Sequence, residues 1–142
     1  MTIVVDASVA LKWYWSEPDS EAALTLLHSD RRMIAPDLIV AELCDAAWRL
    51  IRRRQMRAGQ MQILTSGAPR AFARLHDLAS LAPRAGRIAL AIDHPAYDCF
   101  YLALSEAEDA PLVTADGKLV TKLAGTPFAG RTLHLSAAAA RS

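Results

Sequence analysis

Residues 2–6 read Thr2-Ile3-Val4-Val5-Asp6, and this stretch decides the fold class of the chain. A short run of β-branched and apolar residues is typical of a buried strand, and the acid marks its end. Similar runs recur between segments with helical character. The further expected strands are Met33–Ala35, Leu112–Thr114 and Thr132–Leu135, with Phe72–Leu75 as a weaker candidate. Strands that alternate with helices indicate an α/β domain with a mostly parallel central sheet flanked by helices.

The helical segments differ in how clearly the sequence marks them. Ala96–Ala107 is apolar nearly all round, which is typical of a helix inside a layered fold. Asp77–Ile92 is mostly helical in pattern, with an interruption expected around Pro83 and Gly86. We expect one domain over residues 1–136 and a frayed or loosely helical tail over 137–142. The other expected helices are Ala7–Trp15, Pro18 to about His28, Asp37 to about Met56, Gln60–Ser66 and Asp116–Leu123.

Composition excludes several classes of protein. The 142 residues are 53% hydrophobic, which excludes a disordered or collagen-like chain and fits a single domain. No window approaches the roughly 18 uninterrupted apolar residues that a membrane span needs. The opening residues include an acid and no basic stretch, unlike a signal peptide, and Cys44 and Cys99 are too far apart for a CxxC metal clamp. We therefore expect a cytoplasmic domain with a substantial core and no membrane contact.

The net charge of +1 conceals a segregation of charge along the chain. Residues 46–92 contain nine arginines and one acid, Asp77, whereas the rest of the chain is acidic. Arginine suits phosphate groups better than lysine does, so this segment is a candidate for binding a polyanion. Solvated helix faces explain the same arginines equally well, and both interpretations stay open.

Four acids fall where an α/β fold would gather them. Asp6 follows the first strand and Asp116 follows the strand at 112–114, so both belong at the carboxyl edge of the sheet, where ligands bind. Glu42 and Asp98 lie in apolar helices, where an uncompensated carboxylate is costly. No lysine or arginine lies near Asp98 in the sequence, so a metal ion is the obvious counter-charge. Clustered carboxylates favour Mg²⁺ or Mn²⁺ over zinc.

Simpler explanations exist for most of these acids. Asp6 and Asp116 could cap the helices that follow them, and Asp98 could complement a helix dipole. Glu42, in mid-helix apolar surroundings, has no such explanation. The histidines show no metal-ligand spacing, and we interpret them as surface or capping groups: His28, His76, His94 and His134.

Four blocks of the sequence carry a resemblance to a known family. In order along the chain they are Val4–Trp13, Ala35–Glu42, His94–Ala103 and Leu112–Leu119. They resemble the PIN-domain ribonucleases, and in particular the VapC toxins of bacterial VapBC toxin–antitoxin pairs. The likeness covers almost the whole chain and is weakest between Gly59 and Ala91.

The resemblance implies a function and a site. It implies an endoribonuclease toxin that hydrolyses RNA phosphodiester bonds with Mg²⁺ or Mn²⁺. It also implies a VapB-type antitoxin as partner and, commonly, a homodimer. The acidic metal cluster would consist of Asp6, Glu42, Asp98 and Asp116, with Ser8 and Thr114 as polar residues beside it. Arg49, Arg52 and Arg53 extend the helix of Glu42 and are candidates for guiding RNA towards the acids.

The aromatic triplet Trp13-Tyr14-Trp15 spreads around a helix too widely for one buried face. Either one or two of the rings pack inside while the rest lie under a loop, or the rings form part of a groove for a partner helix.

Two other functions compete with the nuclease. The stronger is a non-catalytic α/β module that binds nucleic acid or protein and whose acids only cap helices. A receiver-type phosphoryl-transfer protein also places acids after strands, but it needs a matched lysine or paired aspartates, and Asp6 is followed by Ala7-Ser8. Mn²⁺ binding that is lost on Asp98→Asn would distinguish the nuclease from the capping module.

Overall fold

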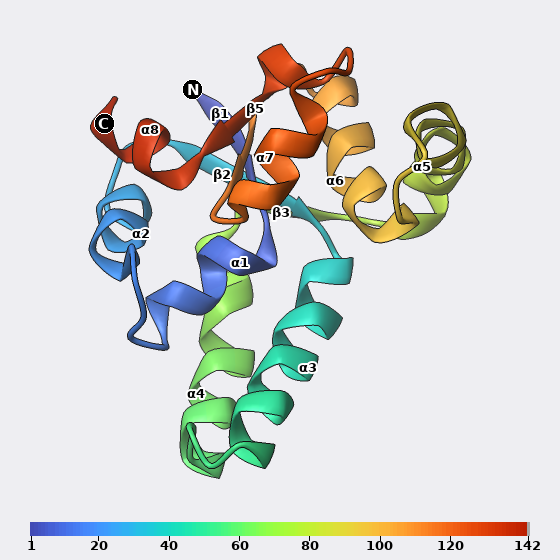
Figure 1. Cartoon of the computed structure of the whole chain (residues 1–142). Coiled ribbons are helices and arrows are strands. Elements are labelled where there is room, and N and C mark those ends of the chain that lie inside the picture. Colours follow the sequence, from blue (N-terminus) through green and yellow to red (C-terminus); the bar gives the residue numbers. More distant parts are fainter. Residues whose placement is uncertain (142) are drawn as a thin grey trace.

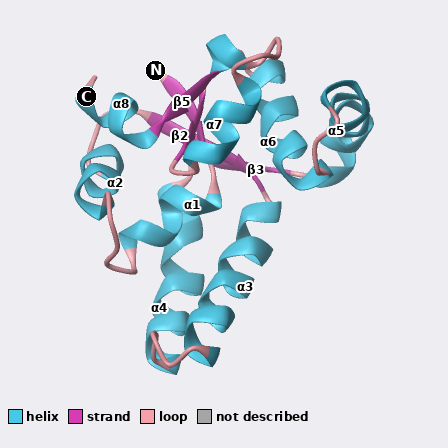
Figure 2. Cartoon of the chain, viewed as in Figure 1, coloured by secondary structure: helices cyan, strands magenta, loops and turns pink. Residues whose placement is uncertain are grey.

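The computed structural model describes residues 1–141 and contains one five-stranded, all-parallel sheet with the order β3-β2-β1-β4-β5 (Figures 1 and 2). β1 lies in the centre and pairs with β2 on one side and β4 on the other. The α/β class and the parallel sheet expected from the sequence are therefore confirmed. The strands are β1 (Thr2–Val5), β2 (Arg32–Pro36), β3 (Arg74–His76), β4 (Leu112–Thr114) and β5 (Thr132–His134).

Helices surround this sheet, and α3 and α4 form a hairpin that projects away from it (Figure 1). The longer helices are α2 (Ser20–Leu27), α3 (Leu38–Arg52), α4 (Ala58–Gly67), α5 (Leu78–Ile92), α6 (Ala96–Ala107) and α7 (Gly117–Leu123). The short ones are α1 (Ala7–Ala10), α8 (Leu135–Ala140) and the 3-10 turns η1 (Leu11–Trp13), η2 (Ala68–Ala71) and η3 (Ala129–Arg131). Within residues 1–141, no helix has the length and apolar character needed to cross a membrane.

The hydrophobic core packs around the sheet, and α6 contributes the most buried helix. Ile3, Val4 and Val5 of β1 are fully buried, as a central parallel strand covered on both faces requires. α6 buries Cys99 and every residue from Tyr101 to Ser105, and it packs against β1, β2, β4 and α5. The expectation that this apolar helix lies inside the fold is confirmed.

Helix α3 ends at Arg52, four residues before the end expected from the sequence. Arg54 adopts a left-handed φ of 59°, the backbone N–H of Gln55 donates to the carbonyl of Leu50, and that of Arg54 donates to Ile51. These are the two hydrogen bonds of a Schellman cap, which closes a helix with a left-handed residue that is usually glycine. The expected end was wrong because a run of arginines carries no visible stop signal.

Helix α5 is continuous, so the interruption expected around Pro83 and Gly86 was wrong. Pro83 lacks the N–H that would bond to the preceding turn. The helix persists because the turns on either side of Pro83 bury Leu81, Ala85 and Ile88, and because α5 packs closely along α6.

Most of the expected C-terminal tail belongs to the packed structure, as residues 135–140 show. Residues 135–140 form α8, which lies against α2 and buries Leu135 and Ala138. Arg31 donates a 3.0 Å hydrogen bond to the Ala138 carbonyl. The boundary expected after residue 136 falls inside this helix, because Leu135 and Ala138 give it an apolar face that packs inward. Ser142, the last residue of the expected tail, lies outside the described residues.

The aromatic triplet packs against the core, in line with the first of its two interpretations. The Trp13 indole N–H donates to the Ala23 carbonyl at 3.0 Å, and the Trp13 ring lies 5.8 Å from that of Phe72. Tyr14 lies so close to Gly67 that a Cβ at that position would be 2.5 Å from its hydroxyl oxygen. All three rings are half-buried.

Candidate active site

Asp6 forms the centre of the acidic site at the carboxyl edge of the sheet. It follows β1 directly, is 8% exposed, and accepts hydrogen bonds from the Ser8 hydroxyl and the Val9 N–H. The Val9 bond makes it the N-cap of α1, as its simpler explanation required. Burial raises the pKa of Asp6 to about 6; the negative charge of Asp98 adds to this, and the hydrogen bonds oppose it.

Ser8 and Thr114 lie where the resemblance placed them, beside Asp6. Thr114 is fully buried at the end of β4, and its hydroxyl oxygen is 3.3 Å from that of Ser8. The Ala115 N–H donates to Ser8, and the Asp116 N–H donates to Thr114. These bonds fix the loop after β4 against the start of α1, although the two segments are more than 100 residues apart in sequence.

Glu42 reaches this site from α3. The Tyr101 hydroxyl of α6 donates to the Glu42 carboxylate at 2.6 Å. Burial raises the pKa of Glu42 above its usual value, the Tyr101 hydrogen bond lowers it, and the charges of Asp6 and Asp98 raise it again. The pKa of Tyr101 is raised well above its usual value by burial and by the same three carboxylates. Sequence analysis did not single out Tyr101.

Asp98 lies at the edge of the site and has a partner that the sequence analysis missed. His94 Nε2 and Asp98 Oδ2 share a 2.7 Å hydrogen bond, and the His94 side chain is only 9% exposed. The interpretation of His94 as a surface or capping group was therefore wrong. The signal that could have found the contact is the four-residue spacing across the start of α6, which puts both side chains on the same face. The other ring nitrogen of His94, Nδ1, is buried and has no hydrogen-bond partner among residues 1–141.

Asp116 is less closely associated with the site than Asp6, Glu42 and Asp98 are. It is exposed and caps α7 by accepting hydrogen bonds from the Lys118 and Leu119 N–H groups. In residues 1–141 no three His, Cys, Asp or Glu side chains are grouped closely enough to hold a metal ion as they stand. The structure thus brings Asp6, Glu42 and Asp98 within electrostatic reach of one another and leaves Asp116 at the rim.

The chemistry of this donor set fits a hard divalent cation. Asp6 is buried and Glu42 half-buried, both have raised pKa values, and in the described part of the chain neither forms an ion pair with a lysine or arginine. A cation at this point would favour the charged form of each and relieve their mutual repulsion. Carboxylate oxygens are the ligands that Mg²⁺ and Mn²⁺ prefer.

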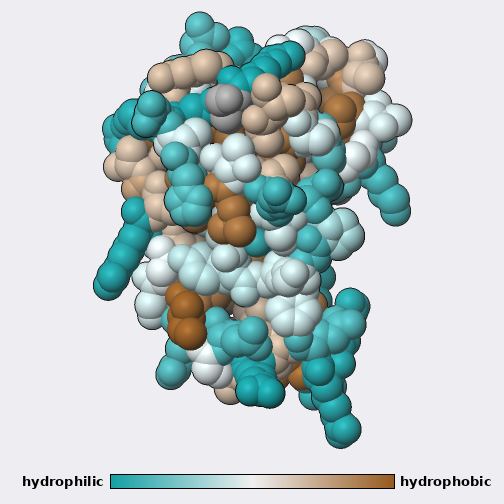
Figure 3. All heavy atoms as spheres, turned by 90° about the vertical axis from the view of Figure 1, so that its left-hand side faces the viewer, coloured by the Kyte–Doolittle hydropathy of each residue, from teal (hydrophilic) through white to brown (hydrophobic). Residues whose placement is uncertain are grey.

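A groove of about 390 Å³ opens beside these acids and is shared by α1, α3 and α6. Arg49 lies in it and forms an ion pair with Asp45. Arg52 and Arg53 do not line it: Arg52 stacks over the Trp48 ring at 5.6 Å, and both arginines are exposed at the tip of the α3–α4 hairpin. The lower end of the molecule, which this tip occupies, is largely hydrophilic (Figure 3). The groove is lined by Ala7, Ser8, Leu11, Leu38, Ala41, Glu42, Asp45, Ala46, Arg49 and Tyr97.

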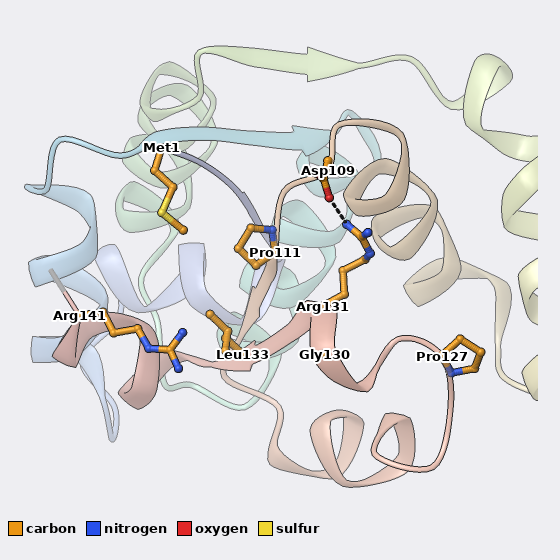
Figure 4. A pocket seen from close by; sticks show the side chains of 8 residues that line it. All are labelled: Met1, Asp109, Pro111, Pro127, Gly130, Arg131, Leu133 and Arg141. Carbon is orange, nitrogen blue, oxygen red and sulfur yellow. Dashed lines mark hydrogen bonds and ion pairs between the residues drawn. The ribbon is translucent and has the colours of Figure 1, made fainter.

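A larger hollow of about 520 Å³ lies at the other edge of the sheet (Figure 4). Met1, Pro111 and Arg131 line it, and these residues precede β1, β4 and β5. The guanidinium of Arg131 is held by the Asp109 carboxylate and the Ser105 carbonyl. In parallel α/β sheets the ligand site lies at the carboxyl ends of the strands, so we place the candidate active site at the acids.

Comparison with known proteins agrees with this geometry. The family model described as PIN domain matches residues 3–124, which is most of the chain. The chain belongs to the PIN domain family. The resemblance that the four sequence blocks suggested is thereby confirmed for the family.

Individual relatives of this PIN domain come from Pyrobaculum aerophilum and Klebsiella pneumoniae. Ribonuclease VapC3 of Pyrobaculum aerophilum is 29% identical over 124 residues, which are 86% of this chain and 95% of the relative. The crystal structure of PAE2754 from Pyrobaculum aerophilum matches with a TM-score of 0.69 and 18% identity, and covers 99% of this chain and 88% of its own. A toxin–antitoxin complex from Klebsiella pneumoniae matches with a TM-score of 0.66 and 16% identity over 94% of this chain and 97% of its own. At these identities the two structures show a shared fold.

Proposed function

We propose that this PIN domain is a Mg²⁺- or Mn²⁺-dependent endoribonuclease that acts in the cytoplasm as the toxin of a toxin–antitoxin pair. The observation that carries the proposal is the proximity of Asp6, Glu42 and Asp98, of which Asp6 is buried and the other two are half-buried. The charge of Asp98 adds to the rise in the pKa values of Asp6 and Glu42, and in the described part of the chain no lysine or arginine forms an ion pair with any of the three. The name of the relative Ribonuclease VapC3 and the toxin–antitoxin complex of similar fold support the biological context.

The chain's own residues would perform distinct tasks in this reaction. Asp6, Glu42 and Asp98 would hold the cation, with Asp116 as a fourth ligand after a change of rotamer at the start of α7. A bound cation would supply Lewis-acid activation of the scissile phosphate and of the attacking water. Tyr101 orients the Glu42 carboxylate, and Ser8 orients that of Asp6. Burial of Asp6 keeps bulk water away from one side of the site.

The exposed arginines would provide the electrostatic attraction for RNA. We assign Arg49 to the groove and Arg52 and Arg53 to more distant phosphates, because the latter two lie about 15 Å along α3 from Glu42 at 1.5 Å per residue. Replacing Arg52 and Arg53 with alanine should reduce the slope of log affinity against log salt by about 1.4 for a single strand with two lost phosphate contacts. We further propose a VapB-type antitoxin as inhibitor and a homodimer as the assembled form.

RNA cleavage by the purified chain tests the proposal. Structured and single-stranded RNAs are incubated with Mg²⁺, Mn²⁺ or EDTA, for the wild type and for Asp98→Asn. Cleavage should require the metal and should fall at least a hundredfold in the variant. Equal cleavage by both proteins would assign the activity to a contaminant and refute the site.

One competing function has a specific observation in its favour. Asp6 and Asp116 do cap helices, and Asp98 does have His94 as a partner, as a non-catalytic binding module would require. Mn²⁺ titration separates the two: the nuclease site should bind the ion and lose it in Asp98→Asn, whereas the binding module should give no specific binding in either protein.

A further inference from the structure

The groove beside the acids has a regular construction. Six of its lining residues form one continuous stripe on α3, because their spacing of three and four residues places them on the same helix face. Ala7 and Ser8 of α1, which packs against α3, and Leu11 of η1 also line the groove. Tyr97, at the start of α6 and next to Asp98 in the sequence, lines it as well. The stripe consists of Leu38, Ala41, Glu42, Asp45, Ala46 and Arg49.

The chemistry of the lining changes along this groove. Its apolar lining consists of alanines and leucines, and Tyr97 is 65% exposed although Tyr101 of the same helix is 2% exposed. Further along α3 from Glu42, Asp45 offers acceptor oxygens and Arg49 offers donor nitrogens, and both side chains are more than half exposed. A partly apolar groove with an aromatic ring and a donor–acceptor pair matches a nucleobase, which has π-faces and a hydrogen-bonding edge.

We propose that this groove binds one nucleobase of single-stranded RNA, with Tyr97 as the stacking surface and Asp45 and Arg49 at the edge of the base. The proposal rests on the proposed nuclease function for its choice of RNA as ligand. Glu42 and Arg49 are seven residues apart, or about 10 Å along α3, so a single nucleotide can reach from the acids to the Asp45–Arg49 pair. The base that the groove holds therefore belongs to a nucleotide directly beside the phosphate at the acids.

Two features favour a base over the other possible occupants. Glu42 and Asp45 would repel a phosphate, so the sugar–phosphate backbone should pass outside the groove, towards the exposed arginines. An apolar helix of a protein partner would cover the exposed charged groups of Asp45 and Arg49 without offering them hydrogen bonds, which is costly. A base edge carries N–H donors that satisfy a carboxylate.

Direct RNA binding tests the assignment without requiring cleavage. Fluorescence anisotropy would measure the affinity of the full chain in EDTA for labelled pentamers of rA, rC, rG and rU. Tyr97→Ala should weaken the best-bound pentamer about tenfold or more, since one lost base stack has at least that effect. Tyr97→Phe keeps the ring and should stay within twofold of the wild type. Ala46→Leu, which fills the groove, should weaken binding as Tyr97→Ala does.

Leu90→Ala provides the matched control. Leu90 is a large, 87% exposed apolar side chain of α5 outside the groove, and its removal should leave RNA affinity unchanged. Wild-type affinity in Tyr97→Ala would overturn the assignment and leave the groove to a protein segment, and a wild type that binds no pentamer would overturn it as well. A chain that cuts no RNA but loses RNA affinity on Tyr97→Ala would refute the nuclease function and support the groove.

Discussion

Replacing Asp6 with asparagine should stabilise the metal-free protein at neutral pH. The pKa of Asp6 is about 6 in the folded chain and near 3.8 without the fold, chiefly because the side chain is buried. At about 1.4 kcal/mol per pH unit, holding this carboxylate charged costs about 3 kcal/mol of folding free energy at pH 7.5. Asparagine has nearly the same shape, keeps an oxygen that can accept from Ser8 and Val9, and carries no charge.

The sign of the pH dependence follows from the raised pKa. Between pH 3.8 and 6 the folded chain holds a proton at Asp6 that the unfolded chain has released, so rising pH destabilises the wild type. The advantage of Asp6→Asn should therefore shrink from about 3 kcal/mol at pH 7.5 to about 1 kcal/mol at pH 4.5. Comparing the two proteins at each pH removes the contributions of other groups, such as Asp77 and Glu106, whose pKa values are lowered.

Denaturant unfolding of both proteins in EDTA from pH 4.5 to 8 measures this difference. At pH 7.5 the gain corresponds to a rise in Tm of about 10 °C for a chain of this size. Adding Mg²⁺ or Mn²⁺ should stabilise the wild type and not the variant, because only the wild type keeps the ligand. Asp30→Asn, at an exposed position, is the matched control. Equal or lower stability of Asp6→Asn at pH 7.5 would refute the claim that this carboxylate is held charged at a cost.

Three further outcomes are expected. His94→Ala removes the hydrogen-bond partner of the Asp98 carboxylate and should weaken Mn²⁺ binding about threefold to tenfold in calorimetry. Unchanged Mn²⁺ affinity would mean that His94 does not position the Asp98 carboxylate. Tyr101→Phe removes the donor that lowers the pKa of Glu42, so the pH midpoint of Mn²⁺ binding should move upward; a midpoint equal to that of the wild type would contradict this. Arg54→Gly should stabilise the chain by about 1 kcal/mol in denaturant unfolding, because glycine freely adopts the left-handed conformation found at the end of α3. A loss of stability would show that contacts of the arginine side chain outweigh the backbone strain.

The sequence was sufficient to predict those features of the fold that depend on interactions between neighbouring residues. Apolar β-branched runs and the helices between them set the α/β class, because strand and helix periods are properties of neighbouring residues. The same reasoning put Asp6 and Asp116 at one sheet edge, since both follow parallel strands. It failed at Pro83, where packing of α5 on α6 outweighs a missing hydrogen bond, and at Arg54, where a helix ends without glycine.

Tertiary structure alone decided which side chains meet. Tyr101 contacts Glu42 across 59 residues of sequence, and Ser8 contacts Thr114 across 106. The strand order β3-β2-β1-β4-β5 brings these segments together, and no local pattern encodes it. The raised pKa of Asp6 and the groove along α3 arise in the same way, because burial and cavity shape depend on every element that packs around a residue. The sequence by itself thus determined which chemical groups are present and at which edge of the sheet, and the fold determined their partners and their charge.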